Sequence, residues 1–400
     1  MKDRKQEILE YIRSLRHIST HSHHLDDNLY EDMGLNRLLN SSYTNWGGPP
    51  PSFNNKAAFE AYINKYKCNS FFRWLSKALE NIYGCELSAE NAPFLDKKIR
   101  KAHMEDPDYH LKLMKDNCRF DLVINDRQPK PGFDLGHPDF FKPSFRCDAF
   151  FSAHLKDKPD PNDFYAYSLF ADKDISDVKD FFEQVRLAIK TKKDEGAVGL
   201  KVAIAYERPL DFENKDLAKA AKAFNNPNAS ESEIHDFGDA LMFELAKYAA
   251  EFSLPLQIHT GLGQGKKTRP AHLQKLIEEN PDTKFHLLHG GYPWFDDCYA
   301  LLVNFKNVYA DSCWTPYLST HAASRFYIEA LESSDAHRIT WGDDAWMAED
   351  SFGAVLAMEE ALSAALAFMT ESGATDINYA FYLAKRILFD NAVDLFNLKI

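Results

Sequence analysis

The sequence predicts an α/β protein, a (β/α)8 TIM barrel with a helical insertion after the first strand. From about residue 195 onward, short apolar and β-branched runs alternate with longer helical patterns, which is typical of βα units around a parallel sheet. The whole chain offers eight such runs, the strand number of this barrel. A doubly wound open sheet stays an alternative, because a strand count does not show closure.

The elements follow in chain order. Three strands are predicted before residue 195, at 17–20, 119–124 and 144–151. Five follow, at 199–206, 254–260, 284–289, 308–312 and 338–341, and helices are predicted after them at 236–252, 270–280, 295–305, 322–333 and 351–369.

The chain has 400 residues, more than the roughly 250 that the barrel needs. We assign most of the surplus to an insertion over residues 46–114, whose aromatic-rich patterns predict helices at 59–66, 71–83 and 96–105. Residues 1–45 then form an N-terminal helix and the first strand, and residues 115–400 form the remainder of the barrel.

Charge and composition exclude several classes of partner. The 47 basic and 60 acidic residues give a net charge of −13, which does not suit binding to a phosphate backbone. No apolar run approaches the roughly 20 residues of a membrane helix, and the first 16 residues lack the apolar centre of a signal peptide. We therefore expect a cytoplasmic protein that binds neither nucleic acid nor membrane. The six cysteines form no Cys-x-x-Cys pair, so buried free thiols are expected.

Polar residues follow the apolar runs at the places where a barrel has its active site, the carboxyl ends of the strands. His21 and His23 follow the first strand with a spacing of two, which puts both imidazoles on one side of the chain. Neutral imidazole is a ligand for zinc, iron, manganese or nickel. A solvated loop is the commoner explanation for an isolated His-x-His pair.

Three more strand ends carry residues of this kind. His259 and His289 end the fifth and sixth strands, with glycines within the next two residues of each, while Asp343 follows the eighth strand. Core histidines are the alternative for the first two. A buried, unpaired carboxylate costs several kcal/mol, and a metal ion would compensate its charge. Taken together, these positions predict a metal site.

These residues, in this order, resemble the amidohydrolase superfamily of metal-dependent barrel enzymes. The resemblance implies that His21, His23 and Asp343 bind a divalent metal, with His259 as a further ligand. It implies that His289 binds a second metal or polarises the substrate. Asp343 would also accept a proton from the water that the metal activates.

A fourth-strand lysine adds to the metal question. In binuclear members of the superfamily such a lysine is carbamylated and bridges two metals, a role that the resemblance offers to Lys201. A clamp for a substrate carboxylate, or a pair with a nearby acid, are the alternatives. We expect one metal ion, with two as the alternative, and favour zinc over manganese, iron or nickel.

The segments 71–75, 143–148 and 256–259 are similar to stretches of the uronate isomerase branch. There an arginine of the third strand holds the sugar carboxylate, which Arg146 could do as a bidentate donor, whereas an ion pair within the chain is the alternative. The chain departs from the superfamily's Asp-x-His-x-His opening at Ser19. It also has Asp343 and Asp344 where that branch has Asp-Ser-Arg.

The sequence thus predicts a metal-dependent hydrolase that acts on a small carboxylated, anionic substrate, with Asp343 as general base. An aldose–ketose isomerase of the uronate type is the first alternative. A barrel that binds a metal or a sugar acid without catalysis is the second. A homo-oligomer is left open.

Overall fold

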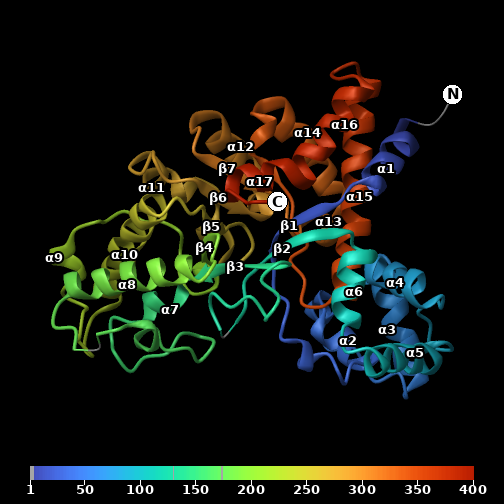
Figure 1. Ribbon diagram of the computed structural model, residues 1–400, viewed down its shortest axis with the longest axis horizontal. Coiled ribbons are helices and arrows are strands. Elements are labelled where there is room, and N and C mark those ends of the chain that lie inside the picture. The colour runs from blue at the N-terminus through green and yellow to red at the C-terminus, as the bar shows by residue number, and fades with distance from the viewer. Residues whose placement is uncertain (1–3, 129, 173) are drawn as a thin grey trace. The chain divides into compact units, whose positions relative to one another are not determined.

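The computed structural model describes residues 4–128, 130–172 and 174–400 (Figure 1). Its strands form one eight-stranded sheet in which each strand neighbours the next along the chain. The pairs from β3 to β8 are all parallel. The predicted (β/α)8 barrel is therefore confirmed. The strands are β1 (His17–Ser22), β2 (Phe120–Asn125), β3 (Phe141–Arg146), β4 (Gly199–Val202), β5 (Leu256–His259), β6 (Phe285–Leu288), β7 (Val308–Asp311) and β8 (Ile339–Thr340).

Hydrogen bonds join β1 to the residues that directly follow β8. The amide of Thr20 donates to the carbonyl of Trp341 at 3.3 Å, and the amide of Asp344 donates to the carbonyl of His21 at 2.9 Å. Gly342 lies at this junction, where a Cβ atom would be 2.6 Å from the amide nitrogen of His21. A glycine is required there because the two backbones approach so closely.

Helices separate the strands. They are α1 (Arg4–Ser14), α2 (Leu35–Ser41), α3 (Lys56–Tyr66), α4 (Ser70–Tyr83), α5 (Ala92–Glu105), α6 (Tyr109–Asp116), α7 (Asp148–Ser152), α8 (Val178–Asp194), α9 (Leu217–Ala220), α10 (Glu231–Glu251), α11 (Gln274–Glu278), α12 (Phe295–Asn304), α13 (Thr315–Leu318), α14 (Thr320–Ser333), α15 (Ala348–Glu371), α16 (Ile377–Lys385) and α17 (Asn391–Phe396).

Two strands, β3 and β4, end well before their predicted ends. The strand predicted at 144–151 begins earlier and ends at Arg146, and the strand predicted at 199–206 ends at Val202. The amide of Cys147 still donates to Lys201, but the amide of Ala203 donates to the side chain of Asp148 at 2.8 Å. This side chain takes the place of a strand neighbour, so the ladder stops and the chain turns into short helices.

The helical insertion lies between β1 and β2, as predicted. Asn55 and Asn69 cap the first turns of α3 and α4 with their side chains, and Gly84 ends α4 in the left-handed conformation. The hydroxyl of Tyr83 donates to Glu349 of α15 at 2.7 Å, and His103 of α5 lies 2.8 Å from the same oxygen atom. These buried contacts attach the insertion to α15.

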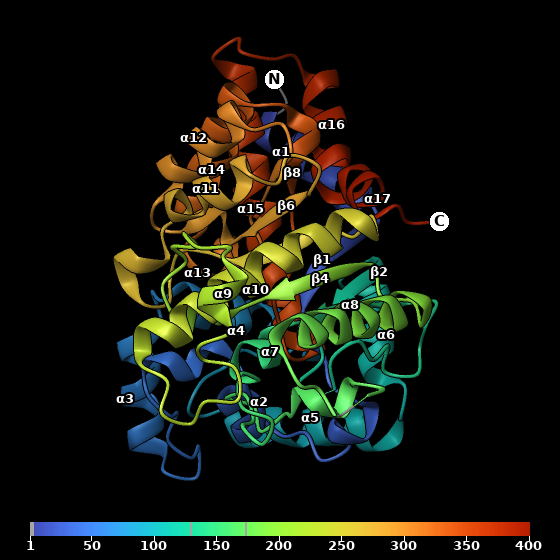
Figure 2. The same cartoon turned by 90° about the vertical axis from the view of Figure 1, so that its left-hand side faces the viewer.

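The chain folds as two compact units. Unit 1 comprises Met1–Val123, Ser312–Glu329 and Trp341–Asp390, and unit 2 comprises Ile124–Asp311, Ala330–Thr340 and Asn391–Ile400. In unit 1, α1 packs along α15 and α16 (Figure 1). In unit 2, α8 and α10 pack against each other (Figure 2).

Helix α15 is the core helix of unit 1. Among the described residues it is the one helix long and apolar enough to cross a membrane by length and composition, and 78% of its apolar window is buried inside the protein. Its partners include α1, α4, α6 and α13. An apolar composition is expected of a helix that is buried to this extent.

His17, at the start of β1, makes the stability of unit 1 depend on pH. Its ring is fully buried and lies edge-on to Trp341. Burial, followed by the charge of Arg119, lowers the pKa of His17 from 6.5 to about 3. Between these two values the unfolded chain binds more protons than the folded one, so the free energy of unfolding falls as the pH falls.

We expect the lowered pKa of His17 to reduce the free energy of unfolding by about 2 kcal/mol at pH 5 relative to pH 7. Urea denaturation of the wild type and of His17→Leu at both pH values measures it, and the variant should lose less stability on acidification. His321→Leu, which removes an exposed histidine of the same unit, is the control and should behave like the wild type. Equal pH dependence in all three proteins would contradict the assignment.

Candidate metal centre

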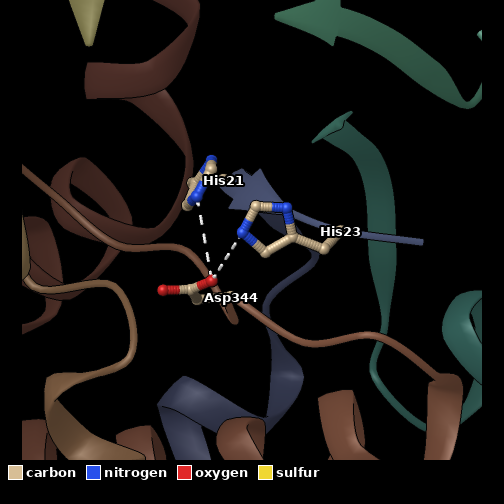
Figure 3. Close-up of side chains that lie close together, drawn as sticks. All are labelled: His21, His23 and Asp344. Atoms are coloured by element: carbon tan, nitrogen blue, oxygen red, sulfur yellow. Dashed lines mark ion pairs between the residues drawn. The ribbon is translucent and has the colours of Figure 1, made fainter. Parts of the chain in front are cut away.

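His21 and His23 lie together at the end of β1, as the sequence predicts. His21 is 1% exposed and His23 is 9% exposed. Their ring centroids are 4.7 Å apart, with one ring edge-on to the other. The spacing of two residues therefore brings both imidazoles to one place (Figure 3).

Asp344 supplies the carboxylate of this cluster. Its Oδ1 atom is 3.3 Å from Nε2 of His23 and 3.7 Å from Nε2 of His21 (Figure 3). The hydroxyl of Tyr43, in the segment that follows α2, donates to the same Oδ1 atom at 3.1 Å. The ring of Trp346 stacks on His23 with centroids 4.7 Å apart. The cluster thus combines residues from the end of β1, the segment after α2 and the segment after β8.

The donor chemistry of this cluster fits a divalent cation. One potential ligand atom from each of His21, His23 and Asp344 lies within 4.8 Å of the others, and all three residues are buried. Two imidazole nitrogens and a carboxylate oxygen suit zinc and the other transition metals. A cation would also compensate the buried charge of Asp344.

Asp343, the predicted ligand and general base, points to a different set of partners. It is fully buried, and its carboxylate accepts hydrogen bonds from the hydroxyls of Ser19, Ser22 and Ser351. The Ser22 contact measures 3.1 Å and the Ser351 contact 2.5 Å. Hydroxyl donors satisfy this carboxylate, while its neighbour Asp344 faces the two histidines. Metal binding by Asp343 stays a prediction.

His24, the next residue along the chain, contacts a different set of side chains. Its Nε2 is 3.6 Å from Asp343 Oδ2, and its Nδ1 is 3.1 Å from Nε2 of His110. Tyr30 stacks on His110 and donates its hydroxyl to the carbonyl of Trp346 at 2.6 Å. Because side chains alternate along an extended chain, neighbouring residues such as His23 and His24 point to opposite sides.

In unit 2, His259 and His289 lie together. Nε2 of His289 is 2.9 Å from Nδ1 of His259, and Nε2 of His259 is 2.6 Å from the carbonyl oxygen of Leu262. Because a carbonyl oxygen only accepts, Nε2 of His259 carries the proton. In the neutral ring Nδ1 is then an acceptor, and His289 is the donor. The two predicted residues thus form a buried, ordered pair.

Glycines after β5 and β6 allow close approach of the backbone segments that follow these strands. A Cβ atom on Gly261 would lie 2.1 Å from the carbonyl oxygen of Tyr292, and its φ of +89° is in the left-handed region. His289 itself has a φ of +66° and is followed by glycines with positive φ. The His-Thr-Gly and His-Gly-Gly patterns therefore reflect tight turns at strand ends.

Arg146, the predicted substrate clamp, is held by two carboxylates of the chain itself. Its Nε lies 3.0 Å from Oδ2 of Asp126 and its Nη1 lies 2.9 Å from Oδ2 of Asp148. Burial lowers the pKa of Arg146, but the charges of Asp126 and Asp148 outweigh it and the net pKa is raised. Burial raises the pKa of Asp148, and Arg146 opposes this. The ion pair considered as an alternative is present, and substrate binding by Arg146 stays a prediction.

Lys201 is buried in β4, with 1% of its surface exposed. It pairs in register with Arg146 of β3, and its charge lowers the pKa of Asp148. Carbamylation of Lys201 remains a prediction.

Comparison with known proteins identifies the family. The family model for amidohydrolases matches residues 183–398, just over half of the chain. Protein fluG of Emericella nidulans is 29% identical over 231 residues, which are 51% of this chain and 26% of that protein. The chain thus spans about a quarter of the length of this curated relative.

Solved structures share the fold. A glucuronate isomerase from Caulobacter crescentus has a TM-score of 0.76 at 16% identity, over 99% of this chain and 94% of the other. A uronate isomerase from Thermotoga maritima has a TM-score of 0.72 at 18% identity, over 98% and 97%. A Lactobacillus casei protein proposed to be a metal-dependent hydrolase has a TM-score of 0.73 at 18% identity, over 98% and 99%.

At these identities the solved structures establish the shared fold, and the family model establishes the kinship: the chain belongs to the amidohydrolase family.

Proposed function

We propose that this protein is a metal-dependent enzyme that hydrolyses a small carboxylated substrate. The observation that carries the proposal is the buried cluster of His21, His23 and Asp344, whose donor atoms lie within 4.8 Å of one another. Membership of the amidohydrolase family supports it. We propose zinc as the metal, with manganese, iron and nickel as alternatives of the same ligand preference.

The chain's residues would divide the work as follows. His21 and His23 would hold the cation through their imidazole rings. Asp344 directs Oδ1 to the same place, where the carboxylate can bind the cation or accept a proton. The hydroxyl of Tyr43 orients that oxygen through its 3.1 Å hydrogen bond. When bound, a divalent cation polarises a substrate carbonyl and lowers the pKa of water.

A uronate isomerase activity is the second candidate. It is favoured by the fold shared with two uronate-type isomerases over nearly the whole chain. It requires a residue that binds the sugar carboxylate, and in this structure Arg146 is already paired with Asp126 and Asp148. We therefore place hydrolysis first.

Metal analysis and a substrate panel test the proposal together. Protein purified without chelator should contain about one equivalent of a transition metal, and removal by a chelator should abolish turnover until the metal is restored. The panel should contain N-acyl amino acids and lactones together with glucuronate and galacturonate. Turnover of the uronates alone would replace hydrolysis by isomerisation. A metal content below about half an equivalent would remove the metal centre itself.

A further inference from the structure

Unit 2 contains a cavity of about 600 Å³ that the mechanism proposed above does not use. Its walls come from the segments that follow β3 and β4 and from the first turns of α10. Apolar side chains supply much of the lining, among them Phe151, Pro159, Ile204 and Ile234. A volume of this size and a mainly apolar wall are typical of sites for small organic molecules.

Two carboxylates, Asp148 and Glu207, border this cavity. The carboxylate of Asp148 is held in place because Oδ2 accepts from Arg146 at 2.9 Å and Oδ1 accepts from the amide of Ala203 at 2.8 Å. Arg146 also pairs with Asp126, and the charge of Lys201 lowers the pKa of Asp148. The three acids Asp126, Asp148 and Glu207 thus stand against these two cations, which favours a further positive charge at this wall.

Glu207 adds a second acid to the same wall. Desolvation by the surrounding protein, followed by repulsion from Asp148, raises its pKa to about 7. Among the described residues its carboxylate has no salt bridge within 4 Å, and Arg146 acts on it only as a more distant charge. A cation that entered the cavity would relieve the repulsion between the two carboxylates.

The basic side chains that line the cavity leave open the role of a counter-ion to these two carboxylates. Arg208 is committed, since its Nη2 lies 2.5 Å from Asp239 and 2.9 Å from His235. Lys158 is then the one other lysine or arginine of the lining, against the acids Asp148, Asp160, Glu207 and Glu231. The balance of charge favours a positively charged guest.

We propose that this cavity binds a small primary amine, with its ammonium group between Asp148 and Glu207 and its apolar body along Phe151, Ile204 and Ile234. The apolar walls suit a short hydrocarbon chain or a single ring. The carboxylates suit a donor with several N–H groups, because charge-assisted hydrogen bonds between an ammonium and a carboxylate are stronger than neutral ones.

Phenethylamine is the probe, with 2-phenylethanol as an isosteric neutral control and phenylacetate as an anionic control of similar size. Isothermal titration calorimetry with the full chain should show that the amine binds at least about tenfold more tightly than either control. Glu207→Gln keeps the size of the side chain and should weaken binding of the amine by about tenfold. Glu195→Gln, an exposed acid of the same unit outside this cavity, should leave it unchanged.

A second variant tests the apolar wall. Ile234→Trp should fill part of the cavity and weaken binding of the amine, while circular dichroism checks that each variant is folded. The proposal is overturned if phenylacetate binds as well as the amine, if neither Glu207→Gln nor Ile234→Trp weakens binding, or if no binding is seen up to about 10 mM. These measurements need no turnover, so their failure is independent of the proposed hydrolytic function.

Discussion

Replacing Asp344 by asparagine is expected to reduce kcat/KM by at least about a thousandfold and to lower the metal content. The substitution keeps the shape of the side chain but removes the negative charge that faces His21 and His23. Steady-state kinetics on the substrate found by the panel, together with elemental analysis of the purified variant, measure both effects.

Asp343→Asn is the matched control, because the two aspartates are adjacent and both are buried. The carboxylate of Asp343 accepts hydrogen bonds from three serine hydroxyls. Replacing Asp343 should therefore lower the free energy of unfolding by about 1–3 kcal/mol while the metal stays bound. Loss of metal in Asp343→Asn, with metal retained in Asp344→Asn, would instead support the sequence-based assignment of Asp343 as the ligand.

Replacing Arg146 by leucine is expected to lower the free energy of unfolding by about 3–5 kcal/mol, because it leaves Asp126 and Asp148 buried without their cation. Arg146→Lys keeps the charge but loses the bidentate geometry, so its free energy of unfolding should lie between those of the wild type and Arg146→Leu. Urea denaturation monitored by circular dichroism measures these differences.

The pH dependence of the leucine variant has a definite sign. Without Arg146 the pKa of Asp148 in the folded state should rise further above its unfolded value, so the folded state binds more protons. Stability is then lost as the pH rises through this range, and the deficit of the variant should shrink at acidic pH. If Arg146 served only as a substrate clamp, Arg146→Lys would raise KM and leave stability unchanged at every pH.

The departure at Ser19 has a structural explanation. The superfamily opening has an aspartate where this chain has serine, and the Ser19 hydroxyl contacts the carboxylate of Asp343. An aspartate at position 19 would bring a second carboxylate against Asp343. Ser19 instead donates a hydrogen bond to the buried carboxylate of Asp343.

The strands could be predicted because apolar runs between turns carry a local signal, and β5 to β8 lie within their predicted ranges. The helices of the insertion were predicted at 59–66, 71–83 and 96–105 for the same reason, since their apolar positions recur with helical spacing. The ends of β3 and β4 were missed. They depend on the side chain of Asp148 reaching the amide of Ala203, a contact between residues 55 positions apart.

The sequence by itself determined the fold class, the strand ends that carry His21, His23, His259 and His289, and the family resemblance. Period-two alternation and chain order can be read from the sequence directly, and they are enough to predict these features. Only the tertiary structure decided that Asp344 rather than Asp343 faces the histidines, because Asp344 adopts a φ of +51° and its amide binds the carbonyl of His21. A shift of one residue at a strand end reverses which side chain faces the site, and backbone contacts with a distant strand set that register.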